Sequence, residues 1–319
     1  MKKRLLFVLI STLIIVPWAL FIFLLHVTTE LDFSTQPLAQ PISPPRDTSL
    51  YLVTYADGAE VFFKNRNMLN FSATNRGIDF IYNYERHHLD CEFLQKNPIL
   101  IEKLGAGYWL WKPYLILKTL QHVPEGSLIV YADSGLFFRQ PIRDMIESGL
   151  KEKDILLFTY DPKIDGSPGQ IASADTFAAM GCTDHRCRYG HHPWAGLIAV
   201  RNSARSRAFI GSWLKFCENQ DLLKGNSNRL PNFPEFTHHQ HDEAILSVLS
   251  NKESAMVNFV VMDHNFRHTI FVHRRKNEEI SLLDDYLSNF SRFQQKFFKS
   301  KLIRKIQSLV NFQDAPHKN

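Results

Sequence analysis

Two segments of the chain carry residues whose types and spacing suit the binding of a diphosphate. The first is the run GAGYWLWKPY over residues 105–114. Its glycines permit close backbone approach, the start of a helix presents N–H groups to anions, and Lys112 adds a positive charge. The second is YADSG over residues 131–135, where Asp133 follows an apolar strand and can hold a divalent cation against a diphosphate. The alternative interpretation is a glycine turn, a buried aromatic pair and an aspartate that caps the next helix.

Asp242 is the second acid that could do chemistry. It opens an apolar segment in which residues 244, 245, 248 and 249 are Ala, Ile, Val and Leu, a spacing that predicts a helix starting near His241. An aspartate in that place suits either a helix N-cap or a catalytic carboxylate that acts as a general base. The sequence leaves both interpretations open.

Histidines cluster around the same acid and again further along the chain. His238, His239 and His241 lie beside Asp242, and three more follow at positions 264, 268 and 273. Residues of these types can ligate zinc. However, the sequence has neither a Cys-x-x-Cys nor a His-Glu-x-x-His frame, so a structural zinc site is disfavoured.

Alternating strands and helices are predicted to position these residues. A strand that ends at Tyr55 before the Asp57-Gly58 turn is the first of several β-branched or aromatic runs. Such alternation predicts an α/β fold with a mainly parallel sheet covered on both faces, in which ligands bind beyond the carboxyl ends of the strands. That rule selects Tyr55, Asp57 and Asp133. The predicted strands are 50–55, 78–82, 127–131, 155–159 and 197–200, and the predicted helices are 59–70, 108–120 (with Pro113 in its first turn), 141–150, 203–218 and one from about 241.

Four motifs in order resemble one known family. They are the GxGYWxWKPY run, the Tyr-x-Asp-Ser-Gly strand end, the Asp175-Thr176-Phe177 element and the run HDEAILSVL over residues 241–249. Together they resemble the nucleotide-diphospho-sugar transferase-like proteins, a family of GT-A glycosyltransferases in which the last motif often has Gln where Glu243 stands. FVHRR over residues 271–275 resembles the closing His-Arg motif of that family. The similarity covers roughly residues 50–276.

The resemblance implies a GT-A, Rossmann-like nucleotide-sugar-binding domain that transfers a sugar from a nucleotide-diphosphate donor to a hydroxyl of a glycan, lipid or protein. It also implies a divalent cation, usually Mn²⁺. Many GT-A enzymes carry Asp-x-Asp, whereas this chain has Asp133-Ser134-Gly135, so the second acid is missing and the cation needs other ligands or is dispensable. The predicted site comprises Asp242 and Asp133 as catalytic residues, Tyr55, Asp57, Trp109, Trp111, Lys112, Asp133, Ser134 and Arg274 as donor-binding residues, and Asp133 and His273 as metal ligands.

Several of these assignments have a structural alternative. Trp109 and Trp111 could stack on a base or a sugar, or could pack in the core. Arg274 could bind phosphate in a bidentate manner, or belong to a solvated basic turn. If the configuration of the sugar inverts, transfer needs a base on the acceptor, which is the role that Asp242 would take.

The two ends of the chain predict a membrane protein. Residues 5–27 are almost entirely apolar, long enough to span a bilayer as a helix, and follow Lys2, Lys3 and Arg4. We therefore expect a cytoplasmic tail at 1–4, a signal anchor at 5–27, a Pro-rich stalk at 28–49, a GT-A-like domain at 50–290 and a basic amphipathic helix at 291–319 that can lie on membrane lipid. This organisation predicts a single-pass type II protein, in the Golgi of a eukaryote or the inner membrane of a bacterium.

Composition and charge exclude several classes of protein. The chain has 319 residues, 45% of them hydrophobic and 22% charged, which excludes a largely disordered chain or a disulfide-dense mini-protein. The net charge of +5 comes from the two ends, since residues 5–290 carry about four more acids than bases. A nucleic-acid partner is therefore not expected. Cys182 and Cys187 enclose four residues, a loop short enough for a local disulfide in an oxidising compartment.

Three functional hypotheses follow from these observations. The first is a membrane-anchored glycosyltransferase that transfers a hexose or pentose. The second is a catalytically inactive relative that binds a nucleotide or a glycan, which the missing second acid favours. The third is a membrane-tethered structural protein whose Trp and His residues belong to the core. Donor hydrolysis or transfer separates the first from the others, and binding of a nucleoside diphosphate separates the second from the third.

Overall fold

The computed structural model describes residues 40–42, 48–161, 166–227, 229–263, 266 and 269–272. These residues all belong to one compact unit, His26–Glu278. The predicted anchor at 5–27, most of the stalk, the amphipathic helix at 291–319, His273 and Arg274 lie outside the described residues. Within the described part of the chain, no helix has both the length and the apolar character needed to cross a membrane.

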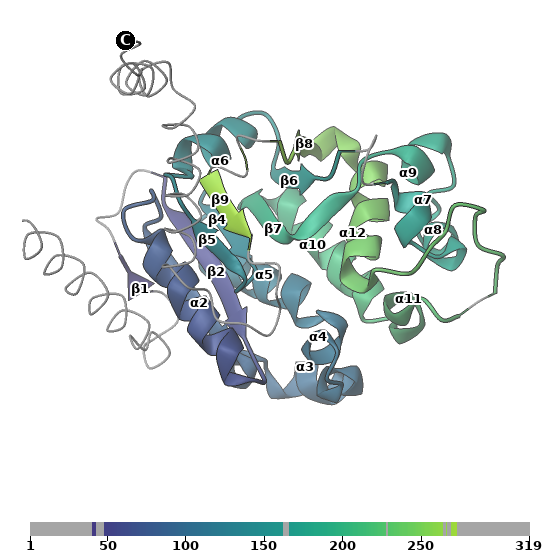
Figure 1. Ribbon diagram of the computed structural model, residues 1–319, viewed down its shortest axis with the longest axis horizontal. Helices are drawn as coiled ribbons and strands as arrows, with labels where there is room; N and C mark the ends of the chain where they lie inside the picture. Colours follow the sequence, from purple (N-terminus) through teal and green to yellow (C-terminus); the bar gives the residue numbers. More distant parts are fainter. Residues whose placement is uncertain are drawn as a thin grey trace, which may run out of the picture. The chain divides into compact units, whose positions relative to one another are not determined.

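A seven-stranded mixed sheet forms the centre of the unit, in the order β1-β3-β2-β4-β7-β6-β8 (Figure 1). Strands β2, β3, β4, β6 and β8 run in one direction, whereas β1 and β7 run in the other; β1 and β8 were not predicted from the sequence. The sheet is therefore mainly parallel, as predicted. The strand β7 is the difference, because it lies antiparallel between β4 and β6. The strands are β1 (Gln40–Pro41), β2 (Leu50–Ala56), β3 (Phe80–Glu85), β4 (Leu128–Ala132), β6 (Ile155–Thr159), β7 (Pro193–Arg201) and β8 (Val257–Val261), with β5 (Leu136–Phe138) and β9 (Ile270–Val272) pairing in a second sheet.

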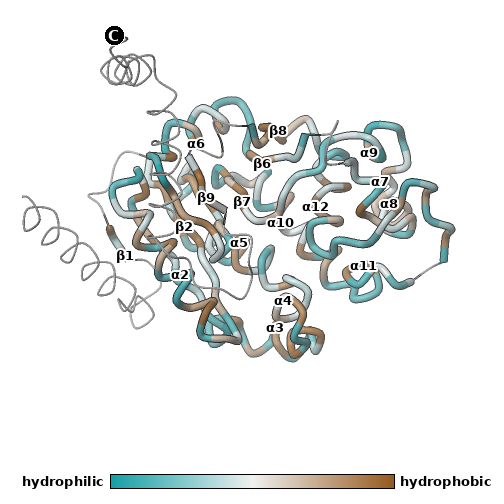
Figure 2. The backbone as a smooth tube through the Cα atoms, viewed as in Figure 1, coloured by the Kyte–Doolittle hydropathy of each residue, from teal (hydrophilic) through white to brown (hydrophobic). Residues whose placement is uncertain are grey.

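Helices cover both faces of the sheet because successive strand side chains point to opposite sides. On one face, Val53 and Tyr131 belong to a core that α5, α10 and α12 complete. On the other face, Leu52 and Val130 pack with α2, α6 and β5. Figure 2 shows hydrophobic residues along β2 and hydrophilic ones along the outer loops near α9. The helices are α2 (Glu60–Ala73), α3 (Cys91–Lys96), α4 (Gly105–Tyr108), α5 (Trp111–His122), α6 (Arg143–Gly149), α7 (Pro168–Ile171), α8 (Ala174–Met180), α9 (His185–Tyr189), α10 (Ala204–Cys217), α11 (Gln220–Lys224) and α12 (His241–Lys252), with 3₁₀ turns at Arg86–His88, Pro98–Ile101 and Ser254–Met256.

Most predicted elements are present, and the differences have local causes. β6 has the predicted bounds, and α10 follows a capping box at Ser203, whose hydroxyl accepts from the Ser206 N–H. The predicted helix over 108–120 begins later, at Trp111, because Tyr108 and Trp109 have left-handed backbone angles of φ 56° and 60°. Pro113 still lies in the first turn of α5. The predicted strand at 197–200 extends back to Pro193, which adds residues that later prove to line the candidate site.

The Asp175-Thr176-Phe177 element fixes the connection that leads into α12. The Asp175 carboxylate accepts hydrogen bonds from the Ser227 hydroxyl (2.6 Å) and the Arg229 N–H (2.9 Å). Phe177 contacts Phe233 edge to face, with ring centroids 5.1 Å apart. Figure 1 shows α7, α8, α9 and α11 gathered beside α12. The motif therefore holds the loop before α12 in place, and through it the start of that helix.

Candidate active site

A cleft of about 1220 Å³ opens where β2 and β4 end. Parallel neighbouring strands bring their carboxyl ends to one edge of a sheet, which is where ligands of such folds bind. The structure brings every described residue of the predicted site to this cleft, although the sequence separates them by up to 187 positions. They are Tyr55, Asp57, Trp109, Trp111, Lys112, Asp133, Ser134 and Asp242.

An ammonium group between two carboxylates forms the centre of the cleft. Lys112 Nζ lies 3.1 Å from Asp242 Oδ2 and 3.6 Å from Asp133 Oδ1. The side chains of Lys112 and Asp242 are 3% and 5% exposed, whereas that of Asp133 is 34% exposed. The Lys112–Asp242 pair is therefore buried, and Asp133 is the carboxylate that faces the open cleft.

Burial and charge together set the ionisation of this centre. Burial raises the pKa of Asp242 to about 7, although the nearby Lys112 ammonium opposes the shift. Burial alone would lower the pKa of Lys112, but the carboxylates of Asp133 and Asp242 outweigh it, so the pKa is raised. Lys112 thus stays charged at neutral pH, while Asp242 is divided between its acid and carboxylate forms. A group with such a pKa can exchange a proton at physiological pH.

Asp133 does not cap a helix, because β5 and not a helix follows it. Its N–H donates to the Gly196 carbonyl of β7 (2.9 Å), which fixes the backbone where β4 ends. The Tyr131 hydroxyl donates to Asp133 Oδ1. Burial, with Asp133 next in importance, raises the pKa of Tyr131 well above its usual value, so the hydroxyl remains a donor. The helix-cap interpretation of Asp133 is therefore wrong.

Asp242 does not cap a helix either. Gln240 occupies the N-cap position of α12, and Asp242 is the second residue of the helix, with its side chain turned to Lys112. The preceding residue, His241, has a left-handed backbone (φ 52°), which sharply changes the chain direction at this point. The Asp242 carbonyl accepts a hydrogen bond from Trp213 Nε1 (3.0 Å). Both ends of the residue are thus fixed by contacts from α5 and α10.

Aromatic and charged groups form the wall of the cleft beside β2. Tyr55 stacks on Trp111 with ring centroids 4.0 Å apart, and its hydroxyl donates to Asp57 Oδ2 (3.0 Å). Arg86 Nη1 lies 3.3 Å from the same oxygen. Burial, followed by the charge of Asp57, raises the pKa of Tyr55. Trp111 is only 6% exposed and donates its indole N–H to the Gly105 carbonyl (2.9 Å), so it supports the wall more than it presents a free ring.

Trp109 is held in the cleft by a strained turn. Gly105 (φ +56°) allows the Trp109 indole to pack against its backbone, and a Cβ at this position would overlap the indole ring. Trp109 also stacks on His241, with ring centroids 5.9 Å apart. The glycine run therefore serves the placement of Trp109.

This packing predicts a stability loss for Gly105→Ala. The left-handed backbone costs a non-glycine residue about 1–2 kcal/mol, and the overlap with the indole adds about 1–3 kcal/mol. Gly126→Ala is the matched control, because Gly126 also has a positive φ (+83°) but no atom lies within 4 Å of its added Cβ. We expect Gly105→Ala to lower the melting temperature by several degrees more than Gly126→Ala. Equal shifts would contradict the proposed packing.

Sequence reasoning missed several residues that line the cleft. Glu243 is one: its Oε1 lies 3.0 Å from His192 Nε2, and its Oε2 accepts the Ala195 N–H (2.9 Å). Trp194 is another, and it reaches the cleft because β7 is antiparallel and begins at this edge, whereas Glu243 reaches it from the first turn of α12. Arg86 was missed because it lies in a short 3₁₀ turn without a recognisable motif. Only Glu243 had a signal in the sequence, as the neighbour of Asp242.

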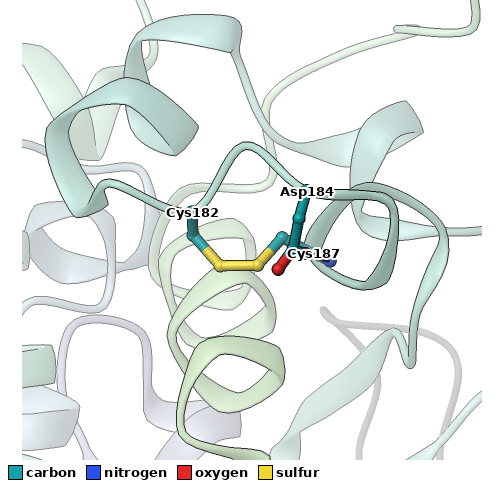
Figure 3. Close-up of side chains that lie close together, drawn as sticks. All are labelled: Cys182, Asp184 and Cys187. Carbon is teal, nitrogen blue, oxygen red and sulfur yellow. Dashed lines mark hydrogen bonds between the residues drawn. A yellow bond between two sulfur atoms is a disulfide. The ribbon is translucent and has the colours of Figure 1, made fainter.

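The histidine cluster lies at the cleft, but the described residues do not make it a zinc site. His238, His239 and His241 line the cleft, and burial lowers the pKa of His239 to about 4. Across the ranges given above, Cys182, Asp184 and Cys187 form the sole group whose ligand atoms lie close enough for a metal (Figure 3). A disulfide joins these two cysteines, as their spacing allows, so their thiolates are not available. Asp184 instead accepts the Cys187 N–H (2.9 Å) as the N-cap of α9.

Asp133 fits a divalent cation that a diphosphate helps to bind. Mg²⁺ and similar cations are commonly held by one or two carboxylates together with substrate phosphates. The half-exposed Asp133 carboxylate at the cleft meets that requirement, and a cation there would neutralise diphosphate charge. β9 ends at Val272, which pairs with Leu136, three residues after Asp133. The other predicted ligand, His273, follows directly but is not among the described residues, and the same holds for Arg274.

Comparison with known proteins gives distant structural matches. No protein family matches the sequence, and no curated protein matches it. Mouse xyloside xylosyltransferase 1 is 12% identical, covers 73% of this chain and 100% of its own, and has a TM-score of 0.43. A glycosyltransferase involved in glycosylation of the major capsid of PBCV-1 is 11% identical (67% and 82% covered, TM-score 0.40). The galactosyltransferase LgtC, with donor and acceptor sugar analogs, is 10% identical (66% and 72% covered, TM-score 0.36). Matches this distant do not establish an activity, and the function of the protein is inferred from the residues of the cleft.

Proposed function

We propose that this protein is a glycosyltransferase that moves a sugar from a nucleotide-diphosphate donor to a hydroxyl group of an acceptor. One observation carries the proposal. Lys112, Asp133 and Asp242 come from α5, from the turn after β4 and from α12, and they meet in a large cleft at the carboxyl edge of the sheet. Burying charges is costly even when they are paired, so a buried charge pair whose groups line a ligand-sized cleft favours a functional role over packing alone.

The charges of the cleft support specific roles for these residues. More acids than bases line the cleft, so an incoming diphosphate meets more negative than positive charge; the acids are Asp57, Glu102, Asp133, Asp242 and Glu243, and the bases are Arg86, Lys103 and Lys112. A divalent cation at Asp133 would reduce this repulsion. We propose that Asp133 holds the donor diphosphate through a cation, for which Mn²⁺ is our first choice. Asp242 would then take the proton from the acceptor hydroxyl, and Lys112 would keep Asp242 oriented.

The remaining parts of the proposal rest on the sequence. The donor-binding roles of Tyr55, Asp57, Trp109, Ser134 and Arg274 are predictions, as is the transfer of a hexose or pentose. The single membrane span at 5–27, the cytoplasmic N-terminus, the membrane-lipid contact of 291–319 and a Golgi location also remain predictions. A type II protein of the Golgi would meet nucleotide sugars in the lumen.

A second candidate function has one observation in its favour. The sequence has glycine (Gly135) where an Asp-x-Asp motif would have its second acid. The Lys112 ammonium group already lies 3.6 Å from the Asp133 carboxylate, in a place where a cation would bind. A catalytically inactive protein that binds a nucleotide or a glycan would show the same cleft. Binding without donor hydrolysis or transfer would identify this alternative.

Nucleotide binding is the first test, and it uses the full chain in detergent. UDP, GDP and CMP are added with and without Mn²⁺, and the melting temperature is followed. A ligand at 100 times its Kd stabilises the folded state by about 2.7 kcal/mol, so we expect a rise of several degrees with one nucleotide. Asp90→Asn is the control, because Asp90 also pairs with a lysine of α5 (Lys118, 2.6 Å) but lies outside the cleft. The control should show the same rise as the wild type. If no nucleotide raises the melting temperature of either protein, the proposed function is wrong.

A further inference from the structure

The direction of β7 brings Trp194 to the edge of the sheet at which the cleft opens. The strand starts at Pro193 and runs antiparallel to β4, so its first residues lie beside the end of β4. The Asp133 N–H donates to the carbonyl of Gly196 (2.9 Å), two residues after Trp194. Trp194 is thus close in the chain to the backbone that fixes Asp133.

The indole of Trp194 is fixed in orientation by the same glycine. A Cβ at position 196 would overlap the six-membered ring of Trp194, so the ring lies against the Gly196 backbone. A larger residue at 196 would force the ring away. One face of the indole is therefore covered by the strand, and the side chain lines the cleft while only partly buried.

Trp194 differs from the other tryptophans that pack here in how its N–H is used. Trp111 Nε1 donates to the Gly105 carbonyl and Trp213 Nε1 to the Asp242 carbonyl, as buried indoles normally do. In the described part of the chain, Trp194 Nε1 has no hydrogen-bond partner. An indole with one face against the protein and an unused donor is suited to a ligand that is both flat and polar.

The polar group next to Trp194 is the carboxylate of Glu243. The N–H of Ala195, its neighbour, donates to Glu243 Oε2, and His192 lies 3.0 Å from Glu243 Oε1, so this carboxylate is fixed beside the strand. Asp242 directly precedes Glu243 on the same turn of α12. A pyranose ring has a face of C–H groups that packs on an aromatic ring and hydroxyls at its edge that bind carboxylates and N–H donors. The wall around Trp194 supplies both.

We infer that Trp194 is the platform for an acceptor sugar, so the acceptor of this protein is a carbohydrate and not a bare lipid or protein hydroxyl. The inference rests on the proposed function and names the acceptor class of that site. The donor occupies the wall formed by Tyr55, Asp57 and Arg86, and the acceptor occupies the wall that begins at Trp194. A cleft of about 1220 Å³ exceeds the usual range of 300–1,000 Å³ for one small ligand, which leaves room for both.

The test compares transfer to a sugar with transfer to water. The full-length protein is given sugar donors that carry the nucleotide identified in the binding test. Release of the nucleoside diphosphate is measured with and without oligosaccharides from a glycan array. In hydrolysis the sugar bonds to water oxygen and the nucleoside diphosphate leaves, so this reaction reports the donor site alone. We expect Trp194→Ala to lower the ratio of transfer to hydrolysis about 10- to 100-fold, mainly through a higher acceptor KM.

Two further variants make the test independent of a folding defect. Trp194→Phe keeps a flat apolar face, so it should recover most of the loss. Gly196→Ala keeps the indole but displaces it, so it should resemble Trp194→Ala. Tyr189→Ala is the matched control, because Tyr189 is an exposed aromatic residue (45%) outside the cleft, and it should behave as the wild type.

The possible failures are distinguishable. If the donor is hydrolysed but no array oligosaccharide accepts the sugar, or Trp194→Ala leaves the acceptor KM unchanged, the inference about the acceptor is wrong while the proposed function stands. If no donor is bound or hydrolysed by the wild type, the proposed function fails, and this inference fails with it.

Discussion

Asp242→Asn is expected to slow sugar transfer by about 10²–10⁴-fold, the range that a general base contributes. Asparagine has nearly the same shape but cannot take a proton. The protein should remain folded, because Lys112 keeps a charged partner in Asp133, 3.6 Å away, so the change does not leave the buried ammonium group unpaired. Steady-state rates with saturating donor and acceptor, together with a melting curve, measure both quantities.

The pH dependence should change in the same variant. Because the pKa of Asp242 is about 7, its base form accumulates as pH rises through that value, and the wild-type transfer rate should rise to a plateau above it. Asp242→Asn should lose this rise.

The stability of the wild type should change with pH in the opposite direction to its transfer rate. The carboxyl group of Asp242 binds a proton more tightly in the folded protein than in the unfolded chain, where its usual pKa is about 4. Wild-type stability should therefore fall as pH increases from about 4 to 7, and the variant should lack that contribution.

Asp90→Asn is again the matched control, since it breaks an aspartate–lysine pair with the same helix away from the cleft. Its transfer rate and pH profile should match those of the wild type. A transfer rate of Asp242→Asn within a few-fold of the wild type, with a retained pH profile, would show that another group is the base.

Asp133→Asn is expected to weaken nucleoside diphosphate binding and turnover together, by about 10- to 100-fold in the presence of Mn²⁺. A charged contact contributes about 1.5–3 kcal/mol, which corresponds to that range. Without a cation the sign should reverse, because the Asp133 carboxylate then only repels the diphosphate. With a chelator present, Asp133→Asn should bind the nucleotide at least as tightly as the wild type. Isothermal titration with Mn²⁺ and with EDTA measures both cases.

Tyr131→Phe tests the same carboxylate without removing its charge. The Tyr131 hydroxyl donates to Asp133, so its loss frees the carboxylate to rotate and should weaken Mn²⁺-dependent binding by only a few-fold. If Asp133→Asn weakens binding equally with Mn²⁺ and with EDTA, Asp133 contacts the nucleotide directly. The cation role proposed for it would then be wrong.

Local pattern alone was sufficient for about half of the described strands and helices and for part of the site. Apolar and aromatic runs located β2, β4 and β6, and the spacing of apolar residues located α12, because strand and helix periodicity are properties of neighbouring residues. Asp133 and Lys112 were also within reach of the sequence. Asp133 follows a strand that ends at the carboxyl edge of an α/β sheet, a rule that depends only on the order of the elements. Lys112 was selected because it lies near the start of a predicted helix, beside the glycine run.

Only the tertiary structure decided how those residues are paired and which others join them. The helix-cap interpretation of Asp242 could be rejected only once Gln240 was seen at the cap and Lys112 lay 3.1 Å from its carboxylate. That contact joins positions 130 residues apart, and no local pattern encodes it. Trp194 was missed for a related reason. Strand direction is set by how the whole chain crosses the sheet, and the antiparallel course of β7 is what brings the start of that strand to the cleft.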